Sequence, residues 1–91
     1  MRAEETDVPR LPRGVKLKYD QVRARHVLLA PERAFDIDEI AAAVLELVDG
    51  KRTCAEIVDA LAARYDEKRE VIADDVKDMI GSLIARRVIE T

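Results

Sequence analysis

The chain has 91 residues with 16 Lys and Arg against 19 Asp and Glu, and 48% of it is hydrophobic although it holds no Trp, two Tyr and one Phe. This length predicts one domain with a thin aliphatic core. So few aromatic rings disfavour the stacking surfaces that bind single-stranded nucleic acid. A single cysteine excludes an internal disulfide and a cysteine-rich zinc site.

The charge is distributed unevenly along the chain. Residues 1–33 hold eight Lys and Arg against five Asp and Glu, whereas residues 34–91 hold eight against fourteen. No apolar run of about 18 residues occurs, and the first residues lack the apolar stretch of a signal peptide. We therefore expect a cytoplasmic protein that does not contact the membrane, with a basic first part and an acidic second part.

Residues 1–14 are polar, contain Pro9 and Pro12, and show no hydrophobic period. Such a composition is typical of a flexible segment. We interpret it as a lead-in or a linker outside the fold, so that the folded domain covers residues 15–91.

Three short strands are predicted next. Residues 15–19 alternate between apolar side chains and lysines, as in a half-buried strand. Residues 24–30 become apolar toward their end and suit a central strand, which Pro31 ends. Residues 34–37 alternate again and place Phe35 and Ile37 on one face, which makes them a third strand.

Three helices follow. Asp38 is a candidate N-cap for a helix over residues 38–48, and Gly50 can take the left-handed conformation that ends it. Thr53 and Glu56 form a capping-box pattern that begins a second helix, which continues toward Tyr65. A third helix over residues 68–87 has a broad apolar face made by Ile72, Val76, Met79, Ile80, Leu83 and Ile84.

The order of three strands and three helices predicts an α+β domain of winged-helix-like type, with antiparallel strands. Residues 88 and 89 form either a last short strand or a packed tail. Winged-helix-like folds bind DNA, peptides or partner proteins, so the fold alone does not identify the function.

Catalytic side chains are not expected. Nucleophilic catalysis needs a nucleophile beside a base, but His26 falls in a predicted strand and Cys54 at a helix start, where it reads as a small buried hydrophobe. The pair Asp74 and Asp75 is explained by the helix dipole. No phosphate-binding glycine loop is present, so we expect neither an enzyme nor a bound cofactor or metal.

A winged helix-turn-helix regulator that binds DNA is the main alternative. A recognition helix normally carries basic side chains toward the phosphates. Here the stretch from 67 to 78 holds five Asp and Glu against three Lys and Arg. That sign of charge disfavours nucleic acid as a partner.

Several motifs, in this order and spacing, resemble the family of pyrroloquinoline quinone (PQQ) biosynthesis protein D, PqqD. They are Leu28-Leu29-Ala30-Pro31-Glu32-Arg33, then Asp49-Gly50-Lys51-Arg52-Thr53 with Glu56-Ile57, and then Asp75-Val76. The resemblance covers about residues 14–90.

This resemblance implies a non-catalytic peptide chaperone, a recognition element for a ribosomally made peptide that is later modified. It would bind the precursor peptide PqqA and present it to PqqE, a radical S-adenosylmethionine enzyme that joins a Glu and a Tyr side chain of the peptide. Cofactors would belong to PqqE. Members fused to another pathway enzyme are also implied, in which case residues 1–14 would be a linker.

An extended peptide can add to an exposed sheet edge while its side chains enter apolar pockets beside that edge. We therefore predict backbone pairing along the third strand and an apolar wall from the third helix. The predicted binding residues are Arg33, Ala34, Phe35, Asp36, Ile37, Val76, Met79, Ile80 and Leu83. Four basic residues of the first two strands and the turn between them are also predicted to steer an acidic peptide electrostatically: Lys16, Lys18, Arg23 and Arg25.

Overall fold

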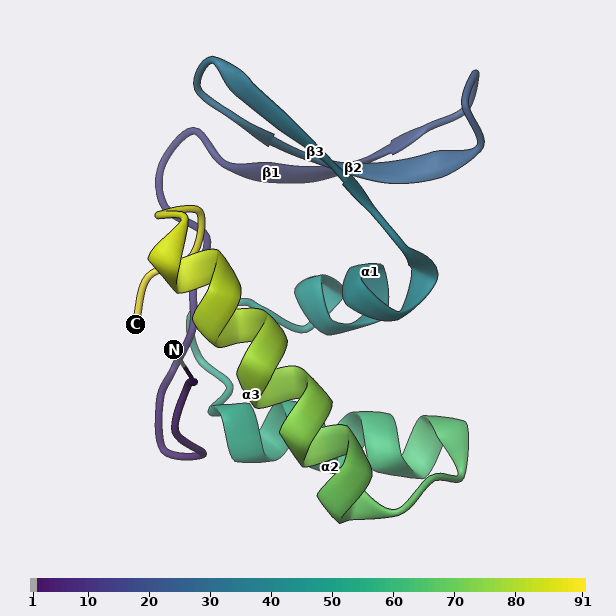
Figure 1. The fold of residues 1–91 in the computed structure, drawn as a ribbon, viewed down its shortest axis with the longest axis vertical. Helices are drawn as coiled ribbons and strands as arrows, with labels where there is room; N and C mark the ends of the chain where they lie inside the picture. Colours follow the sequence, from purple (N-terminus) through teal and green to yellow (C-terminus); the bar gives the residue numbers. More distant parts are fainter. Residues whose placement is uncertain (1) are drawn as a thin grey trace.

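A computed structural model describes residues 2–91 as a small sheet stacked on three helices (Figure 1). The antiparallel sheet has the order β1-β2-β3, which leaves β1 and β3 at its edges. The predicted order of strands and helices is confirmed. The elements are β1 (Lys16–Asp20), β2 (Arg25–Ala30), β3 (Arg33–Ile37), α1 (Glu39–Glu46), α2 (Cys54–Tyr65) and α3 (Arg69–Ala85).

The sheet turns one face toward the helices. Leu28 of the central strand is fully buried and pairs with Leu17 of β1 on one side and Phe35 of β3 on the other. Those two neighbours are partly buried and pack against the same core. The alternation that predicted the strands therefore selects the side chains that contact the helical layer.

Both predicted helix starts are confirmed. The Asp38 carboxylate accepts a hydrogen bond from the Ala41 N–H at 2.8 Å and begins α1. At α2, the Glu56 N–H donates to the Thr53 hydroxyl at 3.1 Å and the Thr53 N–H donates to the Glu56 carboxylate at 2.9 Å. This reciprocal capping box satisfies donors that the first turn of a helix leaves free.

The predicted role of Gly50 is wrong in detail. It does have a left-handed backbone, with φ of 77°, but α1 already ends at its C-cap Leu47. Gly50 instead lies in a turn in which the Asp49 carboxylate accepts the N–H groups of Lys51 and Arg52, both at 2.9 Å. These bonds hold the pKa of Asp49 below its usual range.

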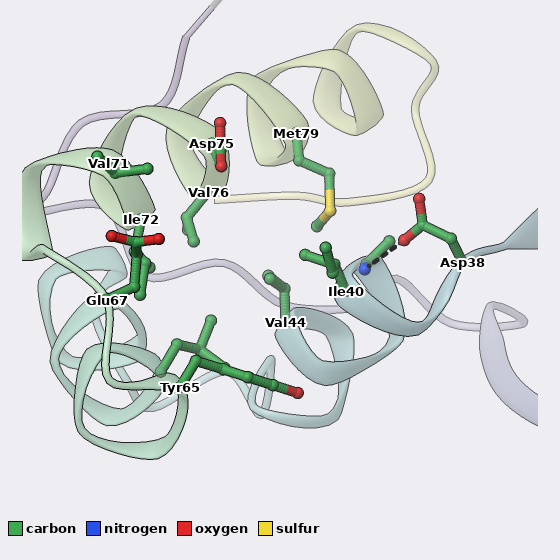
Figure 2. A pocket seen from close by; sticks show the side chains of 12 residues that line it. Asp38, Ile40, Val44, Tyr65, Glu67, Val71, Ile72, Asp75, Val76 and Met79 are labelled. Atoms are coloured by element: carbon green, nitrogen blue, oxygen red, sulfur yellow. Dashed lines mark hydrogen bonds between the residues drawn. The ribbon is translucent and has the colours of Figure 1, made fainter.

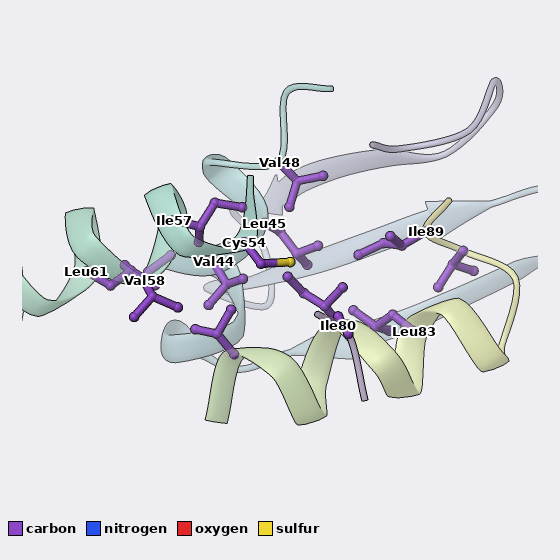
Figure 3. Close-up of a cluster of buried hydrophobic side chains, with 14 of the residues drawn as sticks. Val44, Leu45, Val48, Cys54, Ile57, Val58, Leu61, Ile80, Leu83 and Ile89 are labelled. Carbon is purple, nitrogen blue, oxygen red and sulfur yellow. The ribbon is translucent and has the colours of Figure 1, made fainter. Parts of the chain in front are cut away.

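The core lies where α1, α2, α3 and the sheet meet (Figure 3). Ile57, Val58 and Ile80 are fully buried there, and so is the lone thiol of Cys54. Burial raises the pKa of Cys54. The expectation that this cysteine serves as a small core residue is confirmed.

The interpretation of residues 1–14 as lying outside the fold is wrong for its described part, residues 2–14. Ala3 and Pro9 are buried. The carbonyls of Asp7 and Glu5 accept the N–H groups of Cys54 at 2.8 Å and Ala55 at 3.0 Å. The segment packs because it satisfies donors at the start of α2 that have no partner within the helix.

The end of the chain also packs. Val88 and Ile89 are buried and form no strand, so of the two alternatives they form the packed tail. One residue further on, Glu90 forms an isolated antiparallel bridge with Arg10. The Glu5 carboxylate binds Arg69 at 2.7 Å and Lys77 at 3.3 Å. Residues 2–10 are thus tied to α2, to α3 and to the C-terminal residues. Within residues 2–91, no helix is long and apolar enough to cross a membrane.

Candidate functional site

Strand β3 is an edge strand whose backbone groups alternate in direction. The loop joining it to β2 has two residues, and Ala30 pairs with Arg33 across it. The pair that closes such a hairpin is hydrogen bonded, and the bonded pairs then recur at every second position. Arg33, Phe35 and Ile37 therefore direct their backbone groups to β2, whereas Ala34 and Asp36 direct theirs outward.

The outward groups are available. The register directs the N–H groups of Ala34 and Asp36 away from β2, and outside the sheet they donate to no backbone atom within residues 2–91. Both residues are exposed. An edge of this kind can pair with an extended chain. The sequence predicted the edge, and the structure adds which residues face out.

Beside the end of β3 lies an apolar groove of about 420 Å³, within the range of small-ligand sites. It runs between α1, the second half of α2 and residues 71–79 of α3, and Figure 2 shows Met79 opposite Ile40 across it. Asp38 lies at its rim, directly after β3. The groove is lined mainly by Ile40, Val44, Leu61, Tyr65, Val71, Ile72, Val76 and Met79.

Part of this lining is unusually open for apolar side chains. Ile40 is 69% exposed, Tyr65 48% and Val71 45%. Together with Met79 they form one surface rather than scattered positions, because all four line the same groove. Clustered exposed apolar side chains mark interaction sites more often than isolated ones do.

The predicted apolar wall of α3 is only partly at this surface. The half-buried Met79 lines the groove, and Val76, which is only 2% exposed, belongs to the core and lines the groove from below. Ile80 is fully buried and Leu83 is 6% exposed, so both pack in the core and neither lines the groove. The accessible wall is shifted toward the start of α3, where Val71 and Ile72 replace them.

The four basic residues expected to steer a peptide do not act as one group. Arg23 and Arg25 both bind the same oxygen of Asp36 at 3.0 Å, which neutralises part of their charge. Lys16 and Lys18 are exposed on β1, on the face of the sheet opposite Leu17 and hence away from the helices. Their steering role stays a prediction.

The arrangement of titratable groups does not resemble a catalytic site. His26 lies edge-on against Tyr19, with ring centres 5.0 Å apart, and its Nε2 is 3.9 Å from the Glu46 carboxylate. Cys54 is buried away from it in the helical core. Residues 2–91 contain no group of three His, Cys, Asp or Glu side chains placed to hold a metal ion.

Sequence reasoning missed Ile40, Tyr65 and Val71. Ile40 is the second residue of α1 and has the spacing of a core position, so its pattern does not distinguish it from a buried residue. Tyr65 ends α2 and gave a weak signal, since an amphipathic aromatic side chain at a helix end is often half exposed.

Comparison with known proteins places these features in one family. The family model of coenzyme PQQ synthesis protein D (PqqD) matches residues 25–89. The bifunctional coenzyme PQQ synthesis protein C/D of Methylorubrum extorquens is 52% identical over 85 residues, which are 93% of this chain and 23% of that protein. A PqqA binding protein of Rhodopseudomonas palustris is 51% identical over 79 residues, 87% of this chain and 78% of that one.

A solved structure agrees with the fold. It is the solution NMR structure of the PqqD truncation of Methylobacterium extorquens PqqCD, described as a functional, stand-alone recognition element for ribosomally synthesized and post-translationally modified peptides. It is 50% identical, has a TM-score of 0.85, and the match covers 97% of this chain and 94% of that chain. The resemblance inferred from the motifs is confirmed, and this chain belongs to the PqqD family.

Proposed function

We propose that this chain is a non-catalytic chaperone of PQQ biosynthesis that binds the precursor peptide PqqA. The observation that carries the proposal is the free backbone edge at Ala34 and Asp36, next to an open apolar groove. The names of relatives support the identity of the peptide, because several of them are PqqA binding proteins.

In the proposed complex, PqqA adds as an extra strand along β3. Its backbone pairs with Ala34 and Asp36, and an apolar side chain enters the groove between Ile40 and Met79. The hydrogen bonds provide affinity without regard to sequence, whereas the groove selects the side chain. The order of the two features along β3 then fixes the register of the peptide.

The bound peptide is presented to the radical enzyme PqqE, which performs the cross-linking with its own cofactors. This chain needs no cofactor for that role, since strand addition changes no covalent bond. DNA and membranes are not its partners. Arg2 pairs with Asp74 and Asp78 at 2.8 Å each, but Glu70 and Asp75 of α3 have no ion pair within residues 2–91 and would repel phosphates.

A titration followed by backbone amide shifts tests the peptide partner. PqqA and a duplex DNA oligonucleotide are added separately, at low salt, to protein labelled with ¹⁵N. We expect PqqA to shift the amides of Ala34, Asp36 and the groove residues, and the DNA to shift none of them. Shifts produced by the DNA alone would overturn the proposal and favour the regulator.

A second assay tests presentation. PqqE, S-adenosylmethionine and limiting PqqA are incubated with or without this chain, and both cross-linked peptide and cleaved S-adenosylmethionine are measured. We expect the cross-linked product to require the chain while reductive cleavage proceeds without it. Equal product yields in both reactions would contradict the adaptor role but leave peptide binding intact.

A further inference from the structure

Two arginines from distant parts of the chain meet at the start of β3. Arg33 is the first residue of β3, and Arg86 is the C-cap of α3. The Arg33 guanidinium donates to the Arg86 carbonyl at 3.0 Å. The two guanidinium carbons lie 5.5 Å and 5.9 Å from the centre of the Phe35 ring, so both cations flank one aromatic side chain.

Neither cation is neutralised. Among residues 2–91, carboxylates lie within 4.0 Å of Arg2, Arg10, Arg23, Arg25, Arg52, Arg69 and Lys77, but not of Arg33 or Arg86. Both arginines are exposed. Two positive groups beside the same ring, neither of them with a counter-ion, attract an anion.

Capping of α3 explains only part of this arrangement. A cation at the C-terminal end of a helix is favoured by the helix dipole, and the Arg33 hydrogen bond to the Arg86 carbonyl is such a cap. That bond uses one of the five N–H donors of a guanidinium. The remaining donors of Arg33, and those of the Arg86 side chain, are free to bind a planar anion such as a carboxylate.

The position of the pair relates it to the proposed peptide path. Side chains at every second position of a strand lie on the same face. Arg33 therefore shares a face with Phe35 and Ile37, which pack against the core beneath the sheet. The apolar groove begins at Asp38, beyond the other end of β3. An extended chain rises about 3.3 Å per residue, so the five steps from Arg33 to Asp38 match about five residues of a bound peptide.

We propose that Arg33 and Arg86 form a carboxylate-binding subsite that selects an Asp or Glu side chain of the bound peptide. That acidic residue stands about four to six positions from the apolar residue that fills the groove. The Phe35 ring holds the two guanidiniums in place. This inference rests on the proposed peptide function, and it adds a sequence requirement that backbone pairing alone does not impose.

The test is a double-mutant cycle between protein and peptide. PqqA and variants with single Asp→Asn or Glu→Gln changes are titrated calorimetrically into the parent protein and into Arg86→Gln. A PqqA with an amidated C-terminus separates a side-chain carboxylate from the terminal one. The control variant is Arg13→Gln, which removes an exposed charge from a residue outside the subsite.

We expect Arg86→Gln to weaken PqqA binding about 3- to 10-fold, and Arg13→Gln to change it much less. One carboxylate change in PqqA weakens binding to the parent by the same factor and has no added effect on Arg86→Gln. If every carboxylate change has the same effect on both proteins, the subsite is wrong. If only amidation reproduces the loss, the side-chain assignment is wrong and the terminal carboxylate takes its place.

Arg33→Lys provides a second variant because it keeps the positive charge and loses the planar fork. We expect it to fold like the parent and still to bind PqqA more weakly; unchanged affinity would show that charge alone matters and would overturn the subsite. Amide shifts at Ala34 and Asp36 separate the two proposals. If PqqA still shifts these amides and binds both arginine variants as tightly as the parent, the subsite is wrong and the peptide function stands. If the parent itself binds no PqqA, both fail.

Discussion

Residues 2–10, which contain a turn between Glu4 and Asp7, and strand β3 differ in how their backbone groups are hydrogen bonded. The first segment makes backbone hydrogen bonds to α2, to α3 and to the C-terminal residues, including those from Cys54 to Asp7 and between Arg10 and Glu90. Strand β3 is bonded along one side only. Its outward groups at Ala34 and Asp36 remain open to a further strand.

The difference separates stability from recognition. A segment whose backbone is bonded to several other elements contributes to folding. An edge strand with a free side keeps the capacity to bind, at the risk of unwanted pairing. Changes in residues 2–10 should therefore alter the unfolding free energy, and changes on the outer side of β3 should alter peptide affinity.

The largest loss of stability is expected when a charged side chain replaces the buried Ala3 in residues 2–10. Ala3 is 3% exposed and belongs to the core cluster, whereas Thr6 is exposed. Ala3→Asp buries a carboxylate and should reduce the unfolding free energy by about 3 kcal/mol or more. Thr6→Asp, three residues away, should change it by no more than about 0.5 kcal/mol. Denaturant melts of the two variants make the comparison, and equal melts would mean that the segment does not pack as described.

Proline substitutions in β3 should produce the next largest effect. Their result should depend on whether the lost N–H points to β2 or outward. Phe35→Pro removes an N–H that points to β2, so it should cost about 1 to 3 kcal/mol more than Phe35→Ala. Ala34→Pro removes an outward N–H and should leave most of the stability. It should weaken PqqA binding about fivefold, the equivalent of one hydrogen bond of about 1 kcal/mol.

Melting curves and calorimetric titrations of these three variants decide the point. Ala34→Ser serves as the control for a change of side chain that keeps the N–H. Should Ala34→Pro fold and bind PqqA like the parent, strand addition at this edge is wrong, and the peptide must be sought in the groove alone.

Thr53→Ala should have a smaller effect, confined to stability. It removes the hydroxyl that accepts the Glu56 N–H, and capping residues of this kind contribute about 0.5 to 2 kcal/mol. The loss should fall at the low end, because the Asp7 and Glu5 carbonyls still hold the N–H groups of Cys54 and Ala55. Chemical denaturation measures it. A loss of PqqA affinity in a stable variant would contradict the separation of the two roles.

The parts of the fold that follow from local rules could be predicted from the sequence. Asp38 and Thr53 cap helices because their own neighbours supply the N–H groups, and the alternation around Phe35 needs no distant partner. Residues 2–10 could not be predicted in this way. Apart from the turn between Glu4 and Asp7, their backbone hydrogen-bond partners lie more than 40 positions further along the chain, and their polar composition is the one that normally indicates disorder.

The candidate site likewise has one part that local sequence patterns predict and one part that they do not. The alternation of side chains in the sequence predicts the strand and shows that its backbone groups alternate in direction. Which residues direct those groups outward follows only from the pairing of Ala30 with Arg33 in the structure. The groove could not be predicted, because the sequence does not show which apolar side chains are buried by other elements and which stay exposed. Ile40 and Ile80 have similar patterns in the sequence, yet one is 69% exposed and the other is buried, because only the latter faces the centre of the helical layer.

The smallest expected effect is the loss, at low pH, of the stability that the Glu5 carboxylate contributes. Hydrogen bonds from Arg69 and from Lys77 hold the pKa of Glu5 below its ordinary value of 4.5. A carboxylate whose pKa is lowered in the folded state contributes stability that is fully present above the unfolded pKa and is lost as the pH falls through the folded pKa. Glu5 should thus favour folding at neutral pH, and this contribution should begin to disappear below about pH 4.5.

Glu5→Gln tests this contribution, since it keeps the size of the side chain and removes its charge. The parent should be slightly more stable than the variant at pH 7, and the two stabilities should converge as the pH falls below 4.5. The difference should also shrink in high salt, because the ion pairs of Glu5 with Arg69 and Lys77 are more than one-third exposed on the Glu5 side. Melting temperatures between pH 3 and pH 7 supply the measurement. The absence of a gap at pH 7 would show that Glu5 acts only through its backbone carbonyl on Ala55, which the variant keeps, and that its carboxylate adds nothing to the attachment of residues 2–10.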